Sequence, residues 1–208
     1  MTNLKWTGER VIPKKMLIGD NLVHQAHLAR ILCEHLARYR WATQFCKDKT
    51  VLDASCGSGY GTAILKENAK FAYGLDISKE AIEYAKKNYE KENMIYEVCD
   101  LSKDWLSLTN TFDIIVSFET IEHIENPNIF LKNVKRSFLD KFIFSMPLNN
   151  VGEFHKKEYT LSQAKELIEN IFIKEKNVIQ YYTQKAEIIT ERGDENSRFI
   201  LGIINKVN

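Results

Sequence analysis

The chain has 208 residues and a formal net charge of +1, with 44% hydrophobic residues, 27% charged residues, 3 prolines and 9 glycines. This length suits one domain with a filled core, and the composition excludes a disordered or fibrous chain. The charge balance disfavours a long nucleic acid as partner, because proteins that hold one usually carry a basic excess.

The amino terminus and the cysteines predict a cytoplasmic protein. The first residues, MTNLKWTGERVIPKK, are polar and lack the apolar stretch of a secretory signal. The purely apolar runs, such as 114–116, are too short to span a bilayer, so no membrane span is expected. Cys33, Cys46, Cys56 and Cys99 form no Cys-x-x-Cys pair and have no metal-ligand spacing, which favours reduced thiols.

Short β-branched runs alternate with amphipathic segments along the chain. Residues 1–46 are expected to cap a core formed by 47–208, with a long helix over 24–45, because Leu28, Leu32 and Leu36 recur at helical spacing. Start signals mark three later helices. Ser78 precedes 79–90, and Thr160 with Gln163 forms a capping box ahead of 161–171. Asn126 and Pro127 precede 129–138, with the proline at the first turn.

Seven strands are expected in one doubly wound α/β sheet, mostly parallel; the order 3-2-1-4-5-7-6 is what the family resemblance described below implies. Several are apolar almost throughout, which is typical of strands covered by helices on both faces. The last two are joined by 183–197, which has no helix pattern, so they should pair antiparallel at the edge. The strands are expected at 50–54, 71–76, 95–99, 112–118, 141–146, 178–182 and 198–204.

The strongest motif is VLDASCGSGYGT, residues 51–62. An apolar strand ends on Asp53, a turn with Gly57, Gly59 and Gly61 follows, and a helix begins near Thr62. Glycines let the backbone turn sharply and let a ligand come closer than a side chain would permit. The start of the helix presents unpaired N–H groups to that ligand.

The spacing of this turn distinguishes two kinds of ligand. A nicotinamide-binding turn would read G-x-G-x-x-G and would place a pyrophosphate on the helix terminus. Here the spacing is G-x-G-x-G, and Asp53 stands just before the turn. A carboxylate there suits a ligand with an ammonium group better than a pyrophosphate, which favours S-adenosylmethionine over NAD.

The segment resembles the first motif of class I S-adenosylmethionine-dependent methyltransferases, and the next strands continue the resemblance. Asp76, in FAYGLDIS, stands where this family holds both ribose hydroxyls, Ile77 would pack on the adenine, and Asp100, in EVCDL, would contact the adenine amino group. One departure is Ser55, where the family often has glycine. The resemblance implies a Rossmann-like fold and cofactor contacts from Asp53, Cys56, Gly57, Gly59, Tyr60, Asp76, Ile77, Asp100, Leu101 and Phe118.

A second group of residues follows the fourth strand, in FETIEHI. If Glu119 opens a short helix, Glu119, Glu122 and His123 share one face, and a loop after the fifth strand brings His155 toward them. His123 or His155 could be the catalytic base that removes a proton from an acceptor hydroxyl, with Glu119 orienting it.

Two other interpretations of this group stay open. Glu119, Glu122, His123 and His155 could together hold a divalent cation such as Mg²⁺ that lowers the pKa of the acceptor. The E-x-x-E-H pattern with a later histidine resembles metal-dependent O-methyltransferases that act on RNA 2′-hydroxyls or on catechol-like quinone precursors. In the structural interpretation, Glu122 caps a helix and His123 packs against its neighbours.

The segments TGERVIP, EHLARYRWA and SMPLNN…FHKKEYT resemble a bacterial branch often associated with surface polysaccharide and glycan synthesis. That resemblance implies O-methylation of a sugar, a nucleotide-linked sugar or another small hydroxyl compound. In that branch Glu9, Arg10, Arg38 and Tyr39 could close over the cofactor or the acceptor.

The alternatives are a 2′-O-methyltransferase for an RNA end and an inactive protein of the same fold that supports a partner enzyme. No insertion is large enough for a separate lid domain. The site therefore either stays open to a chain-end substrate or is closed by the neighbour in a homodimer.

Overall fold

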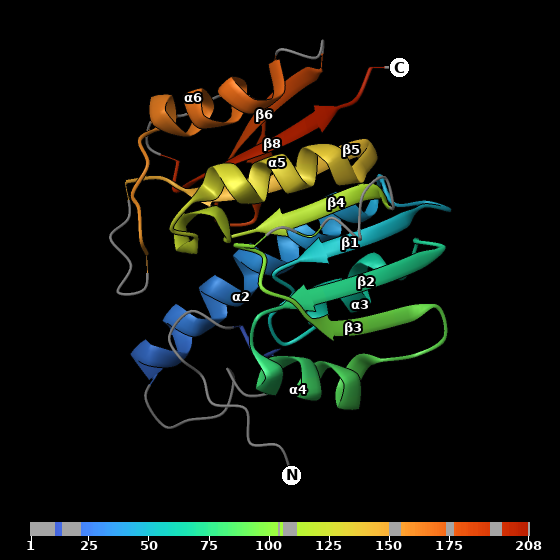
Figure 1. The fold of residues 1–208 in the computed structure, drawn as a ribbon. Helices are drawn as coiled ribbons and strands as arrows, with labels where there is room; N and C mark the ends of the chain where they lie inside the picture. Colours follow the sequence, from blue (N-terminus) through green and yellow to red (C-terminus); the bar gives the residue numbers. More distant parts are fainter. Residues whose placement is uncertain are drawn as a thin grey trace.

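The computed structural model describes residues 11–13, 22–103, 105, 112–149, 155–173, 177–191 and 197–207. In this part of the chain the strands form one 8-stranded sheet in the order β3-β2-β1-β4-β5-β8-β6-β7. Helices cover both of its faces (Figure 1). The expected doubly wound α/β fold is confirmed, with one correction at the edge of the sheet.

The correction is an additional strand, β7. Strands β1 to β5 keep the expected order, and so does the antiparallel pair of β8 and β6 beside β5. Strand β7 then extends the sheet beyond β6. Ala186, at φ 53°, turns the chain back so that Lys185 pairs with Ile188. The segment has no glycine and no Asn-Gly signal of the kind that usually marks such a turn, and the strand is only 3 residues long. The strands are β1 Thr50–Ala54, β2 Phe71–Asp76, β3 Met94–Val98, β4 Phe112–Phe118, β5 Phe138–Pro147, β6 Val178–Lys185, β7 Ile188–Thr190 and β8 Phe199–Asn205.

The helices begin where the sequence signals predict. The Ser78 side chain accepts a hydrogen bond from Ala81 N at 3.3 Å, and the capping box of Thr160 and Gln163 is formed. The Asn126 side chain makes no capping hydrogen bond, although Pro127 does occupy the first turn. The bounds are α2 Leu22–Thr43, α3 Tyr60–Leu65, α4 Lys79–Tyr89, α5 Pro127–Ser137 and α6 Leu161–Phe172, with a short 3-10 helix, η2, at Ile121–His123.

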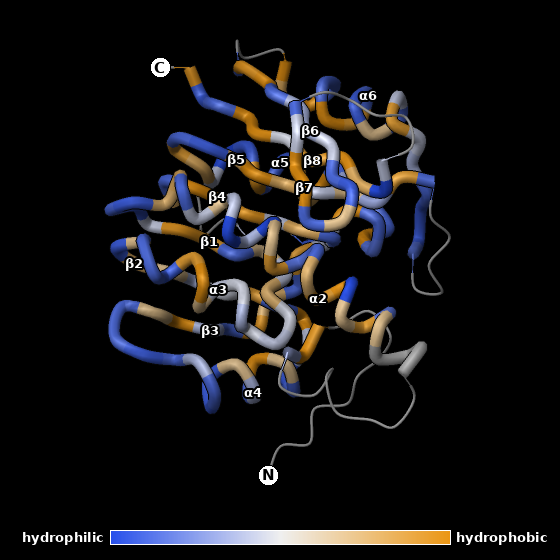
Figure 2. The backbone as a smooth tube through the Cα atoms, turned by 180° about the vertical axis from the view of Figure 1, so that it is seen from behind, coloured by the Kyte–Doolittle hydropathy of each residue, from blue (hydrophilic) through white to orange (hydrophobic). Residues whose placement is uncertain are grey.

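The core lies on both faces of the sheet because successive strand residues point to opposite sides. Leu52 and Ile115 belong to the cluster that includes α5 and α6, whereas Val51 and Ile114 belong to the cluster that includes α2 and α3. Figure 2 shows the apolar strands as a band beneath the more polar helices. Burying each such side chain contributes about 1.5–3 kcal/mol.

No helix within the described ranges has the length and apolar character that crossing a bilayer requires. The parallel strands β1 to β5 all end at one edge of the sheet. In open α/β sheets ligands bind at the carboxyl ends of the strands, so this edge is where a site is expected.

Candidate active site

A pocket of about 440 Å³ lies at the carboxyl ends of β1, β2 and β4. Six of the residues expected to contact a cofactor line it, whereas Asp53, Gly59, Asp100 and Leu101 are not part of its wall. The lining residues are Val11, His35, Tyr39, Ser55, Cys56, Gly57, Ser58, Tyr60, Asp76, Ile77, Phe118, Glu119 and His123.

The turn after β1 needs its glycines for two separate reasons. Gly57 and Gly59 have φ of 53° and 86°, the left-handed region that side chains rarely adopt. A Cβ on Gly59 would overlap Ala85, and one on Gly61 would overlap the ring of Tyr39. Ser55, where the family often has glycine, also has a positive φ of 73°. Glycine adopts this conformation more readily than serine does.

Asp76 joins this turn to the start of α4. Its Oδ2 accepts a hydrogen bond from Gly57 N at 2.9 Å, and its Oδ1 accepts one from Ser78 N at 2.9 Å. Each carboxylate oxygen can accept a second hydrogen bond, so Asp76 retains acceptor capacity toward the pocket. Ile77 beside it is 66% exposed, which leaves an apolar surface on the pocket wall for a flat ring.

Asp53 lies beneath the turn and is fully buried. Tyr39 OH donates to its Oδ1 at 3.1 Å, and Thr62 Oγ1 donates to its Oδ2 at 2.7 Å. Burial raises the pKa of Asp53 to about 7, against the opposing effect of these two hydrogen bonds. The carboxyl group therefore links α2 to α3 behind the pocket wall.

This raised pKa makes stability depend on pH. Between the ordinary pKa of 3.8 and the folded pKa of about 7, the folded protein holds a proton that the unfolded chain releases. Stability from this group is therefore present at low pH and is lost as pH rises through 7. Between pH 5 and pH 8 the unfolding free energy should fall by roughly 2 kcal/mol more in the native protein than in Asp53→Asn. Urea unfolding at both pH values measures this difference, and identical pH profiles would contradict it.

Asp100 and Leu101, at the end of β3, lie outside the pocket wall. Asp100 Oδ1 accepts from Ser102 N at 3.1 Å, and its Oδ2 lies 3.1 Å from Lys103 Nζ. The hydrogen bond from the Ser102 hydroxyl and the contact with Lys103 lower the pKa of Asp100. Leu101 is buried in the core on the α5 side.

Val11, near the amino terminus, also lines the pocket and lies beside the glycine turn. Ser58 Oγ donates to Val11 O at 2.6 Å, and Ile12 packs against Ala81 and Tyr84 of α4. Of the residues expected to close over the site, Tyr39 lines the pocket, Arg38 does not, and Glu9 and Arg10 lie outside the described residues.

His35 is a lining residue that the sequence interpretation missed. Burial, followed by the neighbouring Arg38 charge, holds the pKa of His35 well below its usual value, so its ring is neutral at pH 7. The available signal was helical spacing, because residues three and four apart share a face and Tyr39 follows His35 by one turn.

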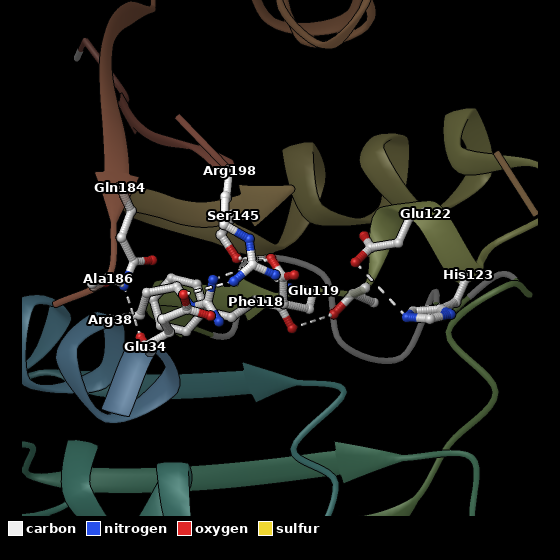
Figure 3. Close-up of polar contacts among 11 residues, drawn as sticks. Glu34, Arg38, Phe118, Glu119, Glu122, His123, Ser145, Gln184, Ala186 and Arg198 are labelled. Atoms are coloured by element: carbon white, nitrogen blue, oxygen red, sulfur yellow. Dashed lines mark hydrogen bonds and ion pairs between the residues drawn. The ribbon is translucent and has the colours of Figure 1, made fainter. Parts of the chain in front are cut away.

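Glu119 is held away from the histidines (Figure 3). It has a φ of 51° and precedes η2 instead of opening a helix, which corrects the expected arrangement. Its Oε1 accepts from Ser145 Oγ at 2.7 Å and lies 3.4 Å from Nη1 of the fully buried Arg38. The Arg38 guanidinium in turn lies 4.4 Å from the centre of the Phe199 ring.

Glu122, His123 and His155 form a compact cluster. Their potential ligand atoms all lie within 4.8 Å of one another, and His123 Nε2 lies 3.8 Å from Glu122 Oε1. Lys156 N and Lys157 N donate to the Glu122 carbonyl oxygen at 2.8 and 3.3 Å, which holds the segment that carries His155 in place. One carboxylate and two imidazoles form a donor set that several divalent metals accept. Three of the four residues expected as ligands thus come together, and Glu119 does not join them.

Residues 46–194 match a family model described as a methyltransferase domain. A probable S-adenosylmethionine-dependent methyltransferase of Mycolicibacterium smegmatis is 25% identical over 178 residues, which are 80% of this chain and 64% of the relative. A ubiquinone biosynthesis O-methyltransferase of Coxiella burnetii is 35% identical over 92 residues, 42% of this chain and 38% of the relative. The chain thus spans less than two thirds of either relative. A TehB-like SAM-dependent methyltransferase from Corynebacterium glutamicum has the same fold, with a TM-score of 0.67, 19% identity, and coverage of 90% of this chain and 100% of that one.

Proposed function

The chain belongs to this methyltransferase-domain family, and we propose that it binds S-adenosylmethionine in the 440 Å³ pocket and methylates a hydroxyl group of a small acceptor. The observation that carries the proposal is the wall formed by the glycine turn, Asp76 and Ile77. It combines close backbone approach, a carboxylate with spare acceptor capacity and an exposed apolar side chain.

These residues fit the parts of the donor. Asp76 would accept hydrogen bonds from the ribose hydroxyls, and Ile77 would cover one face of the adenine. Gly57 would let the amino-acid tail of the donor pass close to the protein backbone. Asp53 would support this wall from behind through Tyr39 and Thr62. When bound, S-adenosylmethionine supplies a methyl group already activated by its sulfonium.

The remaining requirement is an acceptor placed in line with that methyl group. Positioning of this kind contributes on the order of 7–11 kcal/mol to lowering the barrier. His123 lines the pocket and His155 lies beside it, with their ring centres 5.0 Å apart. Either imidazole can take the proton of an acceptor hydroxyl. The match to a ubiquinone biosynthesis O-methyltransferase supports oxygen as the acceptor atom.

The acceptor class that we propose is a sugar, a nucleotide-linked sugar or another small hydroxyl compound. Polar side chains of His35 and His123 lie in the same wall, which suits an acceptor with several hydroxyl groups. An RNA 2′-hydroxyl would meet the same cluster, but a net charge of +1 offers little attraction to a phosphate backbone.

A second role is proposed for the Glu122, His123 and His155 cluster, namely that it binds a divalent cation such as Mg²⁺ or Mn²⁺. The observation that favours it is the convergence of three ligand atoms within 4.8 Å from two separate segments. The cation would lower the pKa of the acceptor hydroxyl. The two roles differ in one measurable respect, because only the second makes methyl transfer depend on added metal.

The donor proposal is tested by thermal unfolding with S-adenosylhomocysteine. At 100 times its dissociation constant a ligand stabilises by about 2.7 kcal/mol, which corresponds to a rise of roughly 5–11 °C in Tm for a domain of this size. NAD at the same concentration should give no rise. Absence of a shift with both S-adenosylhomocysteine and S-adenosylmethionine would contradict the proposal and favour an inactive protein of this fold. Transfer of labelled methyl to a panel of sugars, nucleotide sugars, catechols and RNA ends then identifies the acceptor.

A further inference from the structure

Two carboxylates, Asp76 and Glu119, lie among the described residues that line the pocket. Asp76 is the last residue of β2 and Glu119 follows β4, the strands on either side of β1, so they flank the glycine turn. A donor that extends across the turn would present its sugar to one side and its amino-acid tail to the other. If Asp76 takes the ribose, the carboxylate available to the tail is Glu119.

The two oxygens of Glu119 have different surroundings. Oε1 takes both known contacts, the hydrogen bond from Ser145 Oγ and the ion pair with Arg38. Oε2 has no partner among the residues that the structure describes, and the side chain remains 17% exposed in the pocket wall. Ser145 and Arg38 therefore hold the carboxylate through Oε1, and because the side chain lines the pocket, Oε2 is the oxygen that a ligand could use.

The backbone of Glu119 supports a specific placement. Its φ of 51° lies in the left-handed region, which costs a residue other than glycine about 1–3 kcal/mol. Its N–H donates to Ser145 Oγ at 3.1 Å, so the same serine holds both the backbone and the side chain. Backbone strain of this kind is concentrated at ligand-binding and catalytic positions.

The other acidic candidates are already engaged. Asp53 is fully buried, and a hydroxyl donates to each of its oxygens, so it does not reach the pocket. Glu122 lies in the cluster with His123 and His155, which Glu119 does not join. Glu119 is therefore separate both from the turn carboxylate and from the proposed cation site.

We propose that Glu119 binds the α-ammonium group of S-adenosylmethionine through its Oε2 atom. This inference rests on the proposed donor site and reassigns Glu119 from catalysis to cofactor binding. It also gives Asp53 an indirect part, since Asp53 holds Tyr39 and the turn but does not meet the ligand.

Calorimetry with two ligands tests this assignment. S-adenosylhomocysteine carries the amino-acid tail, and 5′-methylthioadenosine lacks it. In Glu119→Gln, affinity for S-adenosylhomocysteine should fall roughly ten- to a hundredfold, the effect of losing one charge-assisted hydrogen bond, while affinity for 5′-methylthioadenosine stays unchanged. Ser145→Ala, which frees the carboxylate but keeps its charge, should give a smaller tail-specific loss. Glu125→Gln, on the same loop but exposed, is the matched control and should bind both ligands normally.

The possible contrary results are distinct. Equal loss of both ligands in Glu119→Gln would make the residue structural, and no loss would exclude the contact. A loss confined to S-adenosylmethionine would place the carboxylate beside the sulfonium. Weaker Mn²⁺ binding by electron paramagnetic resonance, with normal tail selectivity, would return Glu119 to the cation site. Each of these results overturns the assignment of Glu119 but leaves the donor proposal intact. A native protein that binds neither adenosyl ligand overturns the donor proposal as well.

Discussion

Replacing Asp76 with alanine is expected to weaken binding of S-adenosylhomocysteine by at least about a hundredfold. Charge-assisted hydrogen bonds contribute about 1.5–3 kcal/mol each, and the ribose would receive two of them. The substitution also removes the acceptor for Gly57 N and Ser78 N, so the glycine turn loses its link to α4. Both effects act in the same direction, and isothermal titration calorimetry measures their sum.

Two further variants separate these contributions. Asp76→Asn keeps one acceptor oxygen without the charge and should show an intermediate affinity. Asp113→Asn is a matched control, because Asp113 Oδ2 also accepts a hydrogen bond from a backbone N–H, that of Thr50 at 2.7 Å. Asp113 lies near the amino end of β4, whereas the pocket lies at the carboxyl ends of the strands. That variant should bind the ligand normally. An affinity of Asp76→Ala within threefold of the native value would contradict the assignment of the ribose site.

Replacing His123 with alanine is expected to lower kcat by about 10²- to 10⁴-fold, the usual contribution of a positioned acid or base. His155→Ala should have an effect of similar size. Because the two rings lie together with Glu122, the double variant should lose little more than either single variant. Affinity for S-adenosylhomocysteine should change much less than kcat, since Asp76 and the glycine turn remain. Single-turnover transfer of labelled methyl measures the effect.

The control for these variants is His27→Ala, an exposed histidine of α2 that should leave activity unchanged. The dependence of methyl transfer on added metal distinguishes the two proposed roles of the cluster. If a cation is bound, chelation should abolish activity, Mn²⁺ should restore it, and Glu122→Gln should raise the Mn²⁺ concentration that is required. Full activity in the presence of chelator would leave His123 and His155 as acid–base groups only. Native kcat in His123→Ala and in His155→Ala would exclude both roles.

The cofactor side of the site could be predicted from short segments. The glycine turn, the capping serine of α4 and the capping box of α6 each depend on residues within a few positions of one another. Their geometry can therefore be predicted from the local sequence. The strands around Asp53 and Asp76 are continuous apolar runs, and parallel pairing places their carboxyl ends at one edge. The order of the central strands came from the resemblance to the methyltransferase family, and the structure confirms it.

The arrangement of Glu119, Glu122 and His123 depended on contacts between distant segments. Helical spacing suggested that Glu119, Glu122 and His123 share a face, but Arg38 and Ser145 hold Glu119 elsewhere and give it a left-handed backbone. Burial of Asp53 follows from the approach of Tyr39, a residue on a different element. The extra strand β7 pairs with the outer edge of β6. No local sequence pattern predicts this pairing.

By itself, the sequence of this protein determined the fold class, the glycine turn after β1 and the place of Asp76 at the carboxyl end of β2. Those features arise from backbone preferences and from the alternation of apolar residues, which act over short distances along the chain. Only the tertiary structure decided that Glu119 pairs with Arg38 and Ser145 and stays apart from Glu122, His123 and His155. Burial and charge pairing join residues that lie far apart in the sequence, and no local pattern encodes their distances.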